Sequence, residues 1–277
     1  MARFAKVYTG PKLPFWKQLG LLYARSLAGL LSVAVVFIVV AAVFGGRLPF
    51  LSVFVVAAGA MLGLAAASVW AARERDRLVR ETPLPRFLRQ KLLVSYPHLT
   101  QRDTELVERG LRQFFIACQR SRRKFVAMPS QVVDSMWHEF ILHTSAYREW
   151  CDLVVGRFID HVPAEVLGRK SSTNDGLRRA WFWACRDESI DPKKPSRLPL
   201  LFALDAKFAI PGGFAYVADC RGVRRDGGGG GGGHCGESFS DGSYSGDADG
   251  FGGSDSSSSS SGDGGGDGGS DGGSGCG

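Results

Sequence analysis

The sequence predicts an all-α protein with a two-helix transmembrane hairpin, then a small cytosolic helical domain and a disordered tail. Three observations lead to this prediction. Two long segments near the start carry no charge, apolar residues in the middle recur at helical spacing, and the last part is mainly Gly, Ser and Asp. The predicted parts are a basic amphipathic segment at 1–25, the hairpin at 26–72, the helical domain at 73–225 and the Gly-rich acidic tail at 226–277.

The two uncharged segments are long enough to cross a bilayer as helices. They run from Ser26 to Phe44 and from Leu48 to Ala72. At about 1.5 Å per residue, each reaches or nearly reaches the roughly 30 Å of the hydrocarbon core. Basic residues flank the outer ends of the two segments, and such residues favour the cytoplasmic side of a membrane. We therefore expect an integral membrane protein of the bacterial inner membrane, with two spans and both termini in the cytoplasm.

The charge of the chain is unevenly distributed. All 34 Lys and Arg residues lie before Asp226, together with 18 of the 27 acidic residues, so residues 1–225 carry 34 minus 18, or +16. Such a basic body favours an anionic partner surface. Basic side chains expected to contact anionic lipid headgroups are Arg73, Arg75, Arg77, Arg80, Arg122, Arg123 and Lys124.

The expected partners are therefore the membrane lipid bilayer and an unidentified protein. Nucleic acid ranks last, because the sequence contains no recognisable nucleic-acid-binding module. The oligomeric state does not follow from the sequence.

Helix signals define the elements of the domain at 73–225. Thr100 with Asp103 predicts a capping box at the start of one helix. Ser130 is expected to cap a second helix that continues to Val154. Two shorter helices and a brief extended piece are expected to begin at Asn174, near Pro199 and at Gly213, respectively.

The stretch MWHEFILH resembles a zinc-protease helix but has the wrong spacing. Zinc proteases use H-E-x-x-H, in which the two His lie four residues apart on one helix face. Here His138 and His143 are five residues apart, which separates them by roughly 140° around a helix. The two imidazoles cannot bind one metal ion on a regular helix, and the zinc-protease interpretation is excluded.

A different set of residues is the candidate polar or metal site. Asp134 and His138 lie four apart on one face of the second helix, where a carboxylate can fix the imidazole tautomer. His161 follows in FIDHVP, expected at a helix end or in a turn, and Cys151 lies between them in sequence. Asp and His side chains bind zinc or iron. The competing interpretation, which the sequence favours, is a structural hydrogen bond between Asp134 and His138.

The cysteines and the tail suggest no compact disulfide framework. None of the six cysteines forms a C-x-x-C pair, so we expect them to be small buried residues in a reducing compartment. The tail has very few apolar residues, and its burial cannot offset the entropy lost on ordering. We expect a disordered acidic spacer.

Three stretches carry a family resemblance: MPSQVVDSMWHEFILHTSAYREWC, FIDHVP and LPLLFALDAKFAIP, ahead of a Gly-rich terminus. They resemble the bacterial branch of the glycine-rich domain-containing proteins, over about His98 to Cys220. Where the plant branch often has a second His, this chain has Phe140. The resemblance implies no established reaction. Its signature residues correspond to Asp134, Trp137, His138, Tyr147, Cys151 and His161.

Two functions remain for this combination of features. The first is a membrane-anchored, cytosol-facing interaction or scaffold protein without a cofactor or enzymatic activity. The alternative is a metal-binding protein or metal-dependent enzyme, with zinc or iron held by Asp134, His138 and His161. The first needs no unusual side-chain chemistry, and the sequence favours it.

Overall fold

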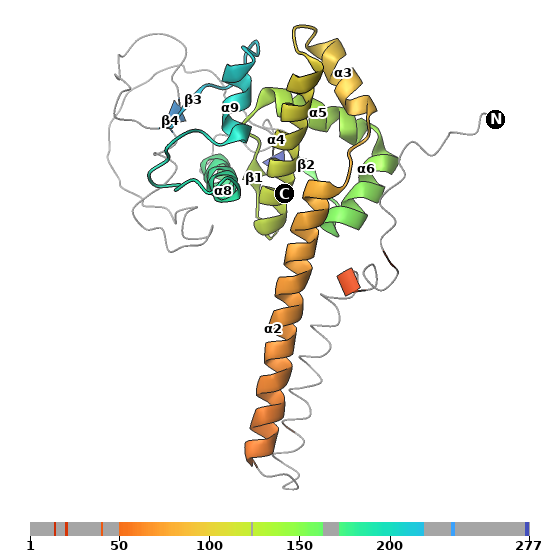
Figure 1. Ribbon diagram of the computed structural model, residues 1–277, viewed down its shortest axis with the longest axis vertical. Coiled ribbons are helices and arrows are strands. Elements are labelled where there is room, and N and C mark those ends of the chain that lie inside the picture. The colour runs from red at the N-terminus through yellow and green to blue at the C-terminus, as the bar shows by residue number, and fades with distance from the viewer. Residues whose placement is uncertain are drawn as a thin grey trace, which may run out of the picture. The chain divides into compact units, whose positions relative to one another are not determined.

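The structure is a computed structural model, and it describes residues 14, 20–21, 40, 50–122, 124–162, 172–218, 234–235 and 275–276. Most of the described residues form helices, and a few form very short strands (Figure 1). The chain divides into two compact units. One comprises Met1–Pro83 with Arg148–Phe158, and the other comprises Leu84–Tyr147 with Ile159–Gly277.

The first unit contains the long helix α2 (Phe50–Glu81) and the π-helix η1 (Cys151–Val155), which contact each other. Gly156 ends η1 with a positive φ of 76° and donates its N–H to the carbonyl of Cys151 at 2.8 Å. A Cβ at this position would lie 1.5 Å from Nη1 of Arg75, so glycine is required both for the turn and for the close approach.

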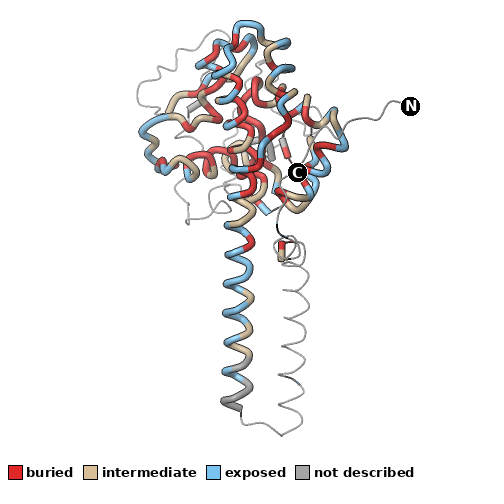
Figure 2. The backbone as a smooth tube through the Cα atoms, turned by 45° about the vertical axis from the view of Figure 1, so that its right-hand side comes forward, coloured by how far each residue is buried: buried red, intermediate tan, exposed pale blue. Residues whose placement is uncertain are grey.

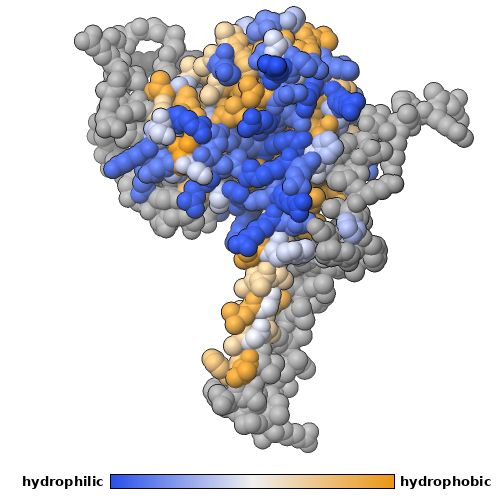
Figure 3. Space-filling view, in the orientation of Figure 1, coloured by the Kyte–Doolittle hydropathy of each residue, from blue (hydrophilic) through white to orange (hydrophobic). Residues whose placement is uncertain are grey.

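The predicted transmembrane hairpin is wrong. Among the described residues, no helix combines the length and apolar character needed to cross a membrane. The second expected span does not stop at Ala72, because α2 continues to Glu81 through the strongly charged stretch RERDRLVRE. Apolar side chains of α2 are visible in Figure 3, whereas Leu78 and Val79 near its end are buried within protein.

The cellular location that was inferred from the hairpin is not supported either. The first expected span, Ser26–Phe44, lies outside the described residues except for Val40. Two membrane spans in the bacterial inner membrane, with both termini in the cytoplasm, are therefore not supported. The transmembrane hairpin in the predicted fold class is wrong. The described residues are mainly helical, as the sequence predicts.

In the second unit, helices pack around α4 (Gln101–Arg120). The core includes Phe114, Phe115 and Trp137, which are all fully buried and whose rings contact one another. Buried segments gather in this part of the chain in Figure 2. The other helices of this unit are α3 (Phe87–Ser95), α5 (Gln131–Leu142), α8 (Ser172–Asp187) and α9 (Leu200–Lys207). The helix α6 (Thr144–Trp150) begins in this unit, and its last three residues belong to the first.

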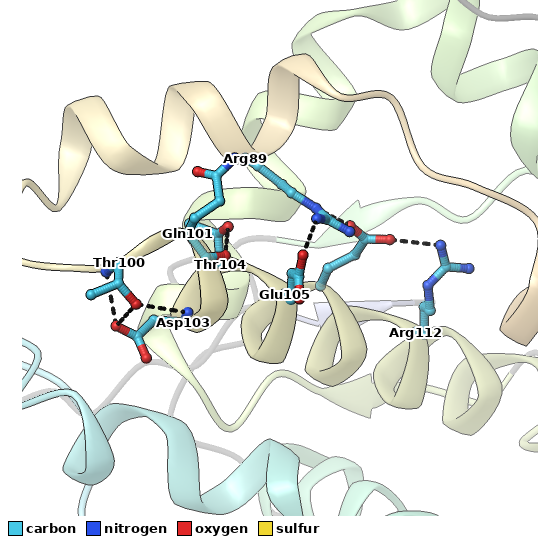
Figure 4. A network of polar contacts seen from close by, with 8 residues as sticks. Arg89, Thr100, Gln101, Asp103, Thr104, Glu105 and Arg112 are labelled. Atoms are coloured by element: carbon cyan, nitrogen blue, oxygen red, sulfur yellow. Dashed lines mark hydrogen bonds and ion pairs between the residues drawn. The ribbon is translucent and has the colours of Figure 1, made fainter.

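The predicted capping box at the start of α4 is confirmed. The carboxylate of Asp103 accepts the backbone N–H of Thr100 at 2.8 Å, and Asp103 donates its own N–H to the Thr100 hydroxyl at 3.3 Å (Figure 4). The Thr100 hydroxyl also donates to this carboxylate, and these hydrogen bonds hold the pKa of Asp103 below its usual value.

A charged network attaches α3 to α4 (Figure 4). Arg89 donates to Glu108 at 2.6 Å and to Glu105 at 2.8 Å, and Arg112 donates to the other oxygen of Glu108 at 2.7 Å. Partial burial lowers the pKa of Arg89, but the bonds and charges of Glu108 and Glu105 outweigh it, and the pKa lies above its usual value. Glu108 is therefore a buried carboxylate shared by two guanidinium groups.

The helix expected from Ser130 to Val154 is divided in the structure. The Ser130 cap is confirmed, since its hydroxyl accepts the N–H of Val133 at 3.4 Å. The helix ends at Leu142, however, and His143 leaves the helical conformation. The Nδ1 of His143 lies 2.9 Å from the carbonyl of Glu139, and its ring stacks on Phe87 with centroids 4.0 Å apart. A side chain that bonds to its own helix carbonyl competes with the next helical turn.

A three-stranded sheet joins distant parts of the second unit. Its order is β1 (Val126–Ala127), β5 (Gly275–Cys276) and β2 (His161–Val162), with both pairs antiparallel. His161 therefore lies in a strand, not in the expected turn or helix end. A disulfide joins Cys118 of α4 to Cys276 of β5. The expectation that all cysteines are unpaired is wrong for these two.

Two further strands involve the end of the helical domain and the tail. β3 (Tyr216–Val217) pairs in parallel with β4 (His234–Cys235), and β3 agrees with the extended piece expected after Gly213. The described residues of the tail, in β4 and β5, are ordered as strands. The rest of the predicted disordered tail lies outside the described residues.

Candidate metal centre

The first turn of α5 is held by a buried carboxylate from α9. Asp205 accepts hydrogen bonds from the Ser130 hydroxyl at 2.7 Å and from the backbone N–H groups of Gln131 at 2.7 Å and Val132 at 3.1 Å. It also accepts the N–H of Phe214 at 3.0 Å. The side chain thus satisfies helix N–H groups that have no partner inside the helix. This fixes the direction in which α5 leaves its cap and the position of the residues that follow.

Asp134, His138 and His161 come together in the second unit. The first two lie one helical turn apart on α5, as their spacing predicts, and His161 reaches them from β2. The Nδ1 of His138 lies 3.6 Å from one carboxylate oxygen of Asp134, and the Nε2 of His161 lies 3.5 Å from the other. One ligand atom from each residue lies within 4.8 Å of the other two.

These separations agree with a metal-binding site. Bonds of about 2.0–2.2 Å in a tetrahedral arrangement place neighbouring ligand atoms roughly 3.3–3.6 Å apart. The two carboxylate–imidazole distances of 3.5 and 3.6 Å fall within that range. They are too long for good hydrogen bonds, whose heavy atoms lie about 2.7–3.2 Å apart. The two distances end at different oxygens of Asp134, so this carboxylate faces both imidazoles, as a carboxylate that shares one ion with them would.

The position of His161 is supported by two neighbouring rings, of which that of Trp137 is buried. Its ring lies 4.7 Å from the ring of Trp137 and 4.4 Å from that of His138, measured between centroids. Trp137 donates its indole N–H to the Tyr147 hydroxyl at 3.1 Å, and this hydroxyl donates to the carbonyl of Ile159 at 2.7 Å. Since Ile159 lies two residues before His161, the chain of bonds sets the approach of β2 to α5.

The Nε2 of His161 faces Asp134 without a hydrogen bond. It is buried, and no hydrogen-bond partner for it exists among the described residues. A buried polar atom that lacks a partner is rare in proteins and requires an explanation. A bound cation would supply one, because neutral imidazole nitrogen is a common metal ligand.

The site opens to solvent beside His138. The His138 side chain is 51% exposed, whereas the side chains of Asp134 and His161 are 19% and 13% exposed. Three protein ligands with one accessible side leave room for a water molecule as a fourth ligand. Catalytic zinc sites and mononuclear iron sites share this feature, unlike closed structural sites.

The other residues predicted for the site do not belong to the cluster of Asp134, His138 and His161. Trp137 packs against His161 and donates to the Tyr147 hydroxyl, so both side chains support the cluster without being ligands. Cys151 is a buried thiol of η1 in the first unit and does not belong to the three-residue set. His143, the second His of the zinc-protease-like stretch, is also not part of the set.

Two of the basic side chains predicted to contact lipid have protein contacts in the structure. Arg77 pairs with Glu81 at 2.9 Å, and Arg75 donates to the carbonyl of Leu21 at 2.7 Å. Arg73 and Arg80 belong to the same helix, Arg122 and Lys124 follow α4, and Arg123 lies outside the described residues. Their contact with anionic lipid stays an untested prediction.

The sequence interpretation missed two residues that shape the site. Asp205 holds the start of α5, and Cys276 lies directly opposite His161 in the sheet. The signal for Cys276 was an isolated cysteine at the end of a Gly/Ser/Asp tract. The signal for Asp205 was an acidic residue within the otherwise apolar LPLLFALDAKFAI.

Tyr147→Phe is expected to lower the free energy of unfolding by about 2 kcal/mol, because the buried Trp137 N–H and Ile159 carbonyl lose their partner. Zinc affinity should fall roughly tenfold as His161 loses its support. Urea denaturation and zinc titration measure the two effects. Tyr96→Phe is the matched control, since it removes the hydrogen bond between the hydroxyl of half-buried Tyr96 and Ser135 and should cost about 0.5–1 kcal/mol. Equal losses in both variants would contradict a special role for Tyr147.

Comparison with known proteins identifies a family for the chain. A family model described as UCP032817-like matches residues 74–239. No curated protein and no solved structure matches the chain. The family that matches is not the glycine-rich domain family, so the resemblance stated from the three sequence stretches is wrong. Those stretches are short, and a Gly-rich tail is a feature of composition rather than of descent.

Proposed function

The chain belongs to the UCP032817-like family, and from the geometry of Asp134, His138 and His161 we propose that it is a metal-binding protein with a single zinc or ferrous ion. The observation that carries the proposal is the convergence of three ligand atoms within 4.8 Å from two separate elements. The match covers α3 to β4, which includes both ligand-bearing elements.

The ligand set favours a transition metal over magnesium or calcium. Two imidazoles and one carboxylate are typical ligands for zinc and for mononuclear iron, whereas the alkaline-earth ions prefer oxygen ligands alone. Cys276 lies opposite His161 in the sheet, but it is in a disulfide and therefore offers no thiolate ligand.

The open side of the site supports chemistry on a bound water. A zinc ion with three protein ligands lowers the pKa of its water to about 7 and supplies a nucleophile at neutral pH. In this chain, Asp134 and His138 would hold the ion on α5, and Trp137 would keep His161 in place. Metal-assisted hydrolysis is the reaction class that this arrangement fits, and the interaction or scaffold role expected from the sequence stays a prediction.

Metal content tests the proposal directly. The full chain, exposed to zinc and then freed of loosely bound metal by dialysis, is expected to retain about one ion per chain by elemental mass spectrometry. His138→Ala removes a direct ligand, so it should lower zinc affinity by more than the roughly 10- to 100-fold typical of an outer-shell partner and lose the ion during dialysis. Because metal competes with protons for its ligands, zinc binding should weaken as the pH falls and should release protons.

His143→Ala is the matched control for this experiment. It removes a second imidazole from the same stretch, but His143 bonds to Glu139 and stacks on Phe87 instead of joining the cluster. It should retain zinc as the unmodified chain does. If the unmodified chain binds no zinc or iron, or if His138→Ala binds them equally well, the proposed function fails.

A further inference from the structure

The strand that holds His161 depends on a distant segment of the chain. β5 is the central strand of the sheet, and among the described residues it is the only strand paired with β2. Cys276 lies directly opposite His161 on one side and Val126 on the other. Directly opposed residues of antiparallel strands have Cβ atoms about 4.5–5.5 Å apart on the same face. Cys276 is thus the cross-strand neighbour of a proposed metal ligand.

A covalent bond holds this strand in place. Cys276 forms a disulfide with Cys118, and the two residues are 158 positions apart in sequence. Closing a loop of that length costs entropy, which the disulfide removes from the unfolded state. Since β5 contributes only two residues to the sheet, its backbone hydrogen bonds alone offset little of the entropy lost on closing the loop.

The disulfide also connects the metal centre to the core. Cys118 lies on α4 close in sequence to Phe114 and Phe115, whose rings contact Trp137. Trp137 in turn packs on His161. Both cysteines are completely buried, so a reductant reaches them only when β5 opens locally. The pairing of β5 with β2 and the position of His161 therefore depend on each other.

We propose that the Cys118–Cys276 disulfide is a redox switch for the metal centre: the oxidised form holds His161 in position to bind metal, and reduction releases β5 and weakens binding. This inference rests on the proposed metal-binding function. The reductant is a dithiol. One of its thiolates attacks a sulfur of the disulfide, a mixed disulfide forms, and the second thiolate resolves it. Both cysteines end as thiols, having gained two electrons and two protons, and the reductant ends as a disulfide.

The switch must act in both directions. If oxidation strengthens zinc binding by a given factor, bound zinc must favour the disulfide over the dithiol form by the same factor. Loss of an outer support of a metal ligand typically costs 10- to 100-fold in affinity. We therefore expect a change of at least roughly tenfold in zinc affinity, and an equal shift in the disulfide–dithiol equilibrium of the chain when zinc is present.

Zinc titration of the full chain tests the switch. Against a chromophoric chelator, Cys276→Ser and Cys118→Ser should each bind zinc at least roughly tenfold more weakly than the oxidised chain. Cys185→Ser is the matched control, because Cys185 is a buried free cysteine of α8 and burial raises the pKa of its thiol, which leaves it protonated and unreactive. It should bind zinc like the unmodified chain.

Two further measurements separate the switch from a general loss of structure. In the His161→Ala background, Cys276→Ser should have no additional effect on zinc affinity, because both changes act through the same ligand. Reduction of the unmodified chain with a phosphine should weaken zinc binding, and reoxidation should restore it.

The outcomes distinguish the inference from the proposed function. If zinc binding requires His138 but is the same in oxidised chain and in Cys276→Ser, the switch is refuted and the metal site stands. Tighter binding after reduction, or equal effects of Cys276→Ser with and without His161, would also overturn the switch. If zinc binding does not require His138, the proposed function itself fails.

Discussion

Asp134→Asn is expected to lower zinc affinity by more than roughly a hundredfold, beyond the 10- to 100-fold typical of outer-shell partners. Asp134 is the one member of the cluster that lies close to both imidazoles, at 3.6 Å from His138 and 3.5 Å from His161. The substitution keeps the size of the side chain and removes its negative charge, which a divalent cation requires for balance. Competitive zinc titration measures the loss.

The same variant separates a metal site from a structural ion pair. If Asp134 serves metal binding, Asp134→Asn should retain the stability of the metal-free chain and lose only the stabilisation that zinc adds to the unmodified chain. Thermal unfolding with and without zinc shows the difference. A structural role alone would give the reverse pattern: lower stability without zinc, and no zinc-dependent rise in either protein.

Asp205→Ala is expected to lower the free energy of unfolding of the second unit by about 3–5 kcal/mol. Asp205 is 3% exposed and accepts four hydrogen bonds that join α9, the cap of α5 and Phe214. Its removal leaves several buried donors without an acceptor, and each such group costs about 1–3 kcal/mol. Urea denaturation followed by circular dichroism measures the change.

Lys207→Ala is the matched control for Asp205→Ala. Lys207 is exposed in the last turn of the same helix, and its removal should change stability by no more than about 0.5 kcal/mol. Asp205→Ala should also weaken zinc binding, because the start of α5 positions Asp134 four residues after its cap. A loss of less than about 1 kcal/mol would show that water replaces the carboxylate at the start of α5.

Features set by neighbouring residues could be predicted from the sequence. The capping box of Thr100 and Asp103 and the Ser130 cap form within one turn of helix, and the structure contains both. The same reasoning excluded His138 and His143 as a shared metal site, since the angle between two helix positions follows from their spacing alone. It also placed Asp134 and His138 on one face of a helix.

Helix length was predicted less well, because it depends on contacts outside the helix. The helix that begins after Ser130 ends at Leu142, where His143 bonds to Glu139 and packs against Phe87 from α3. Charge-free length suggested a membrane span that ends at Ala72, but α2 continues through charged residues whose neighbours Leu78 and Val79 are buried. Neither contact is visible in the local pattern of the sequence.

The sequence by itself determined the helical character of the domain, its caps and the placement of Asp134 and His138 on one helix face, since these depend on residues within one or two helical turns. Only the tertiary structure decided that His161 completes the cluster, that Cys276 lies opposite it, and that Asp205 holds the start of α5. These three residues come from segments far apart in sequence. Strand pairing, disulfide formation and buried hydrogen bonds between such segments depend on how the whole chain packs, and no local spacing rule encodes them.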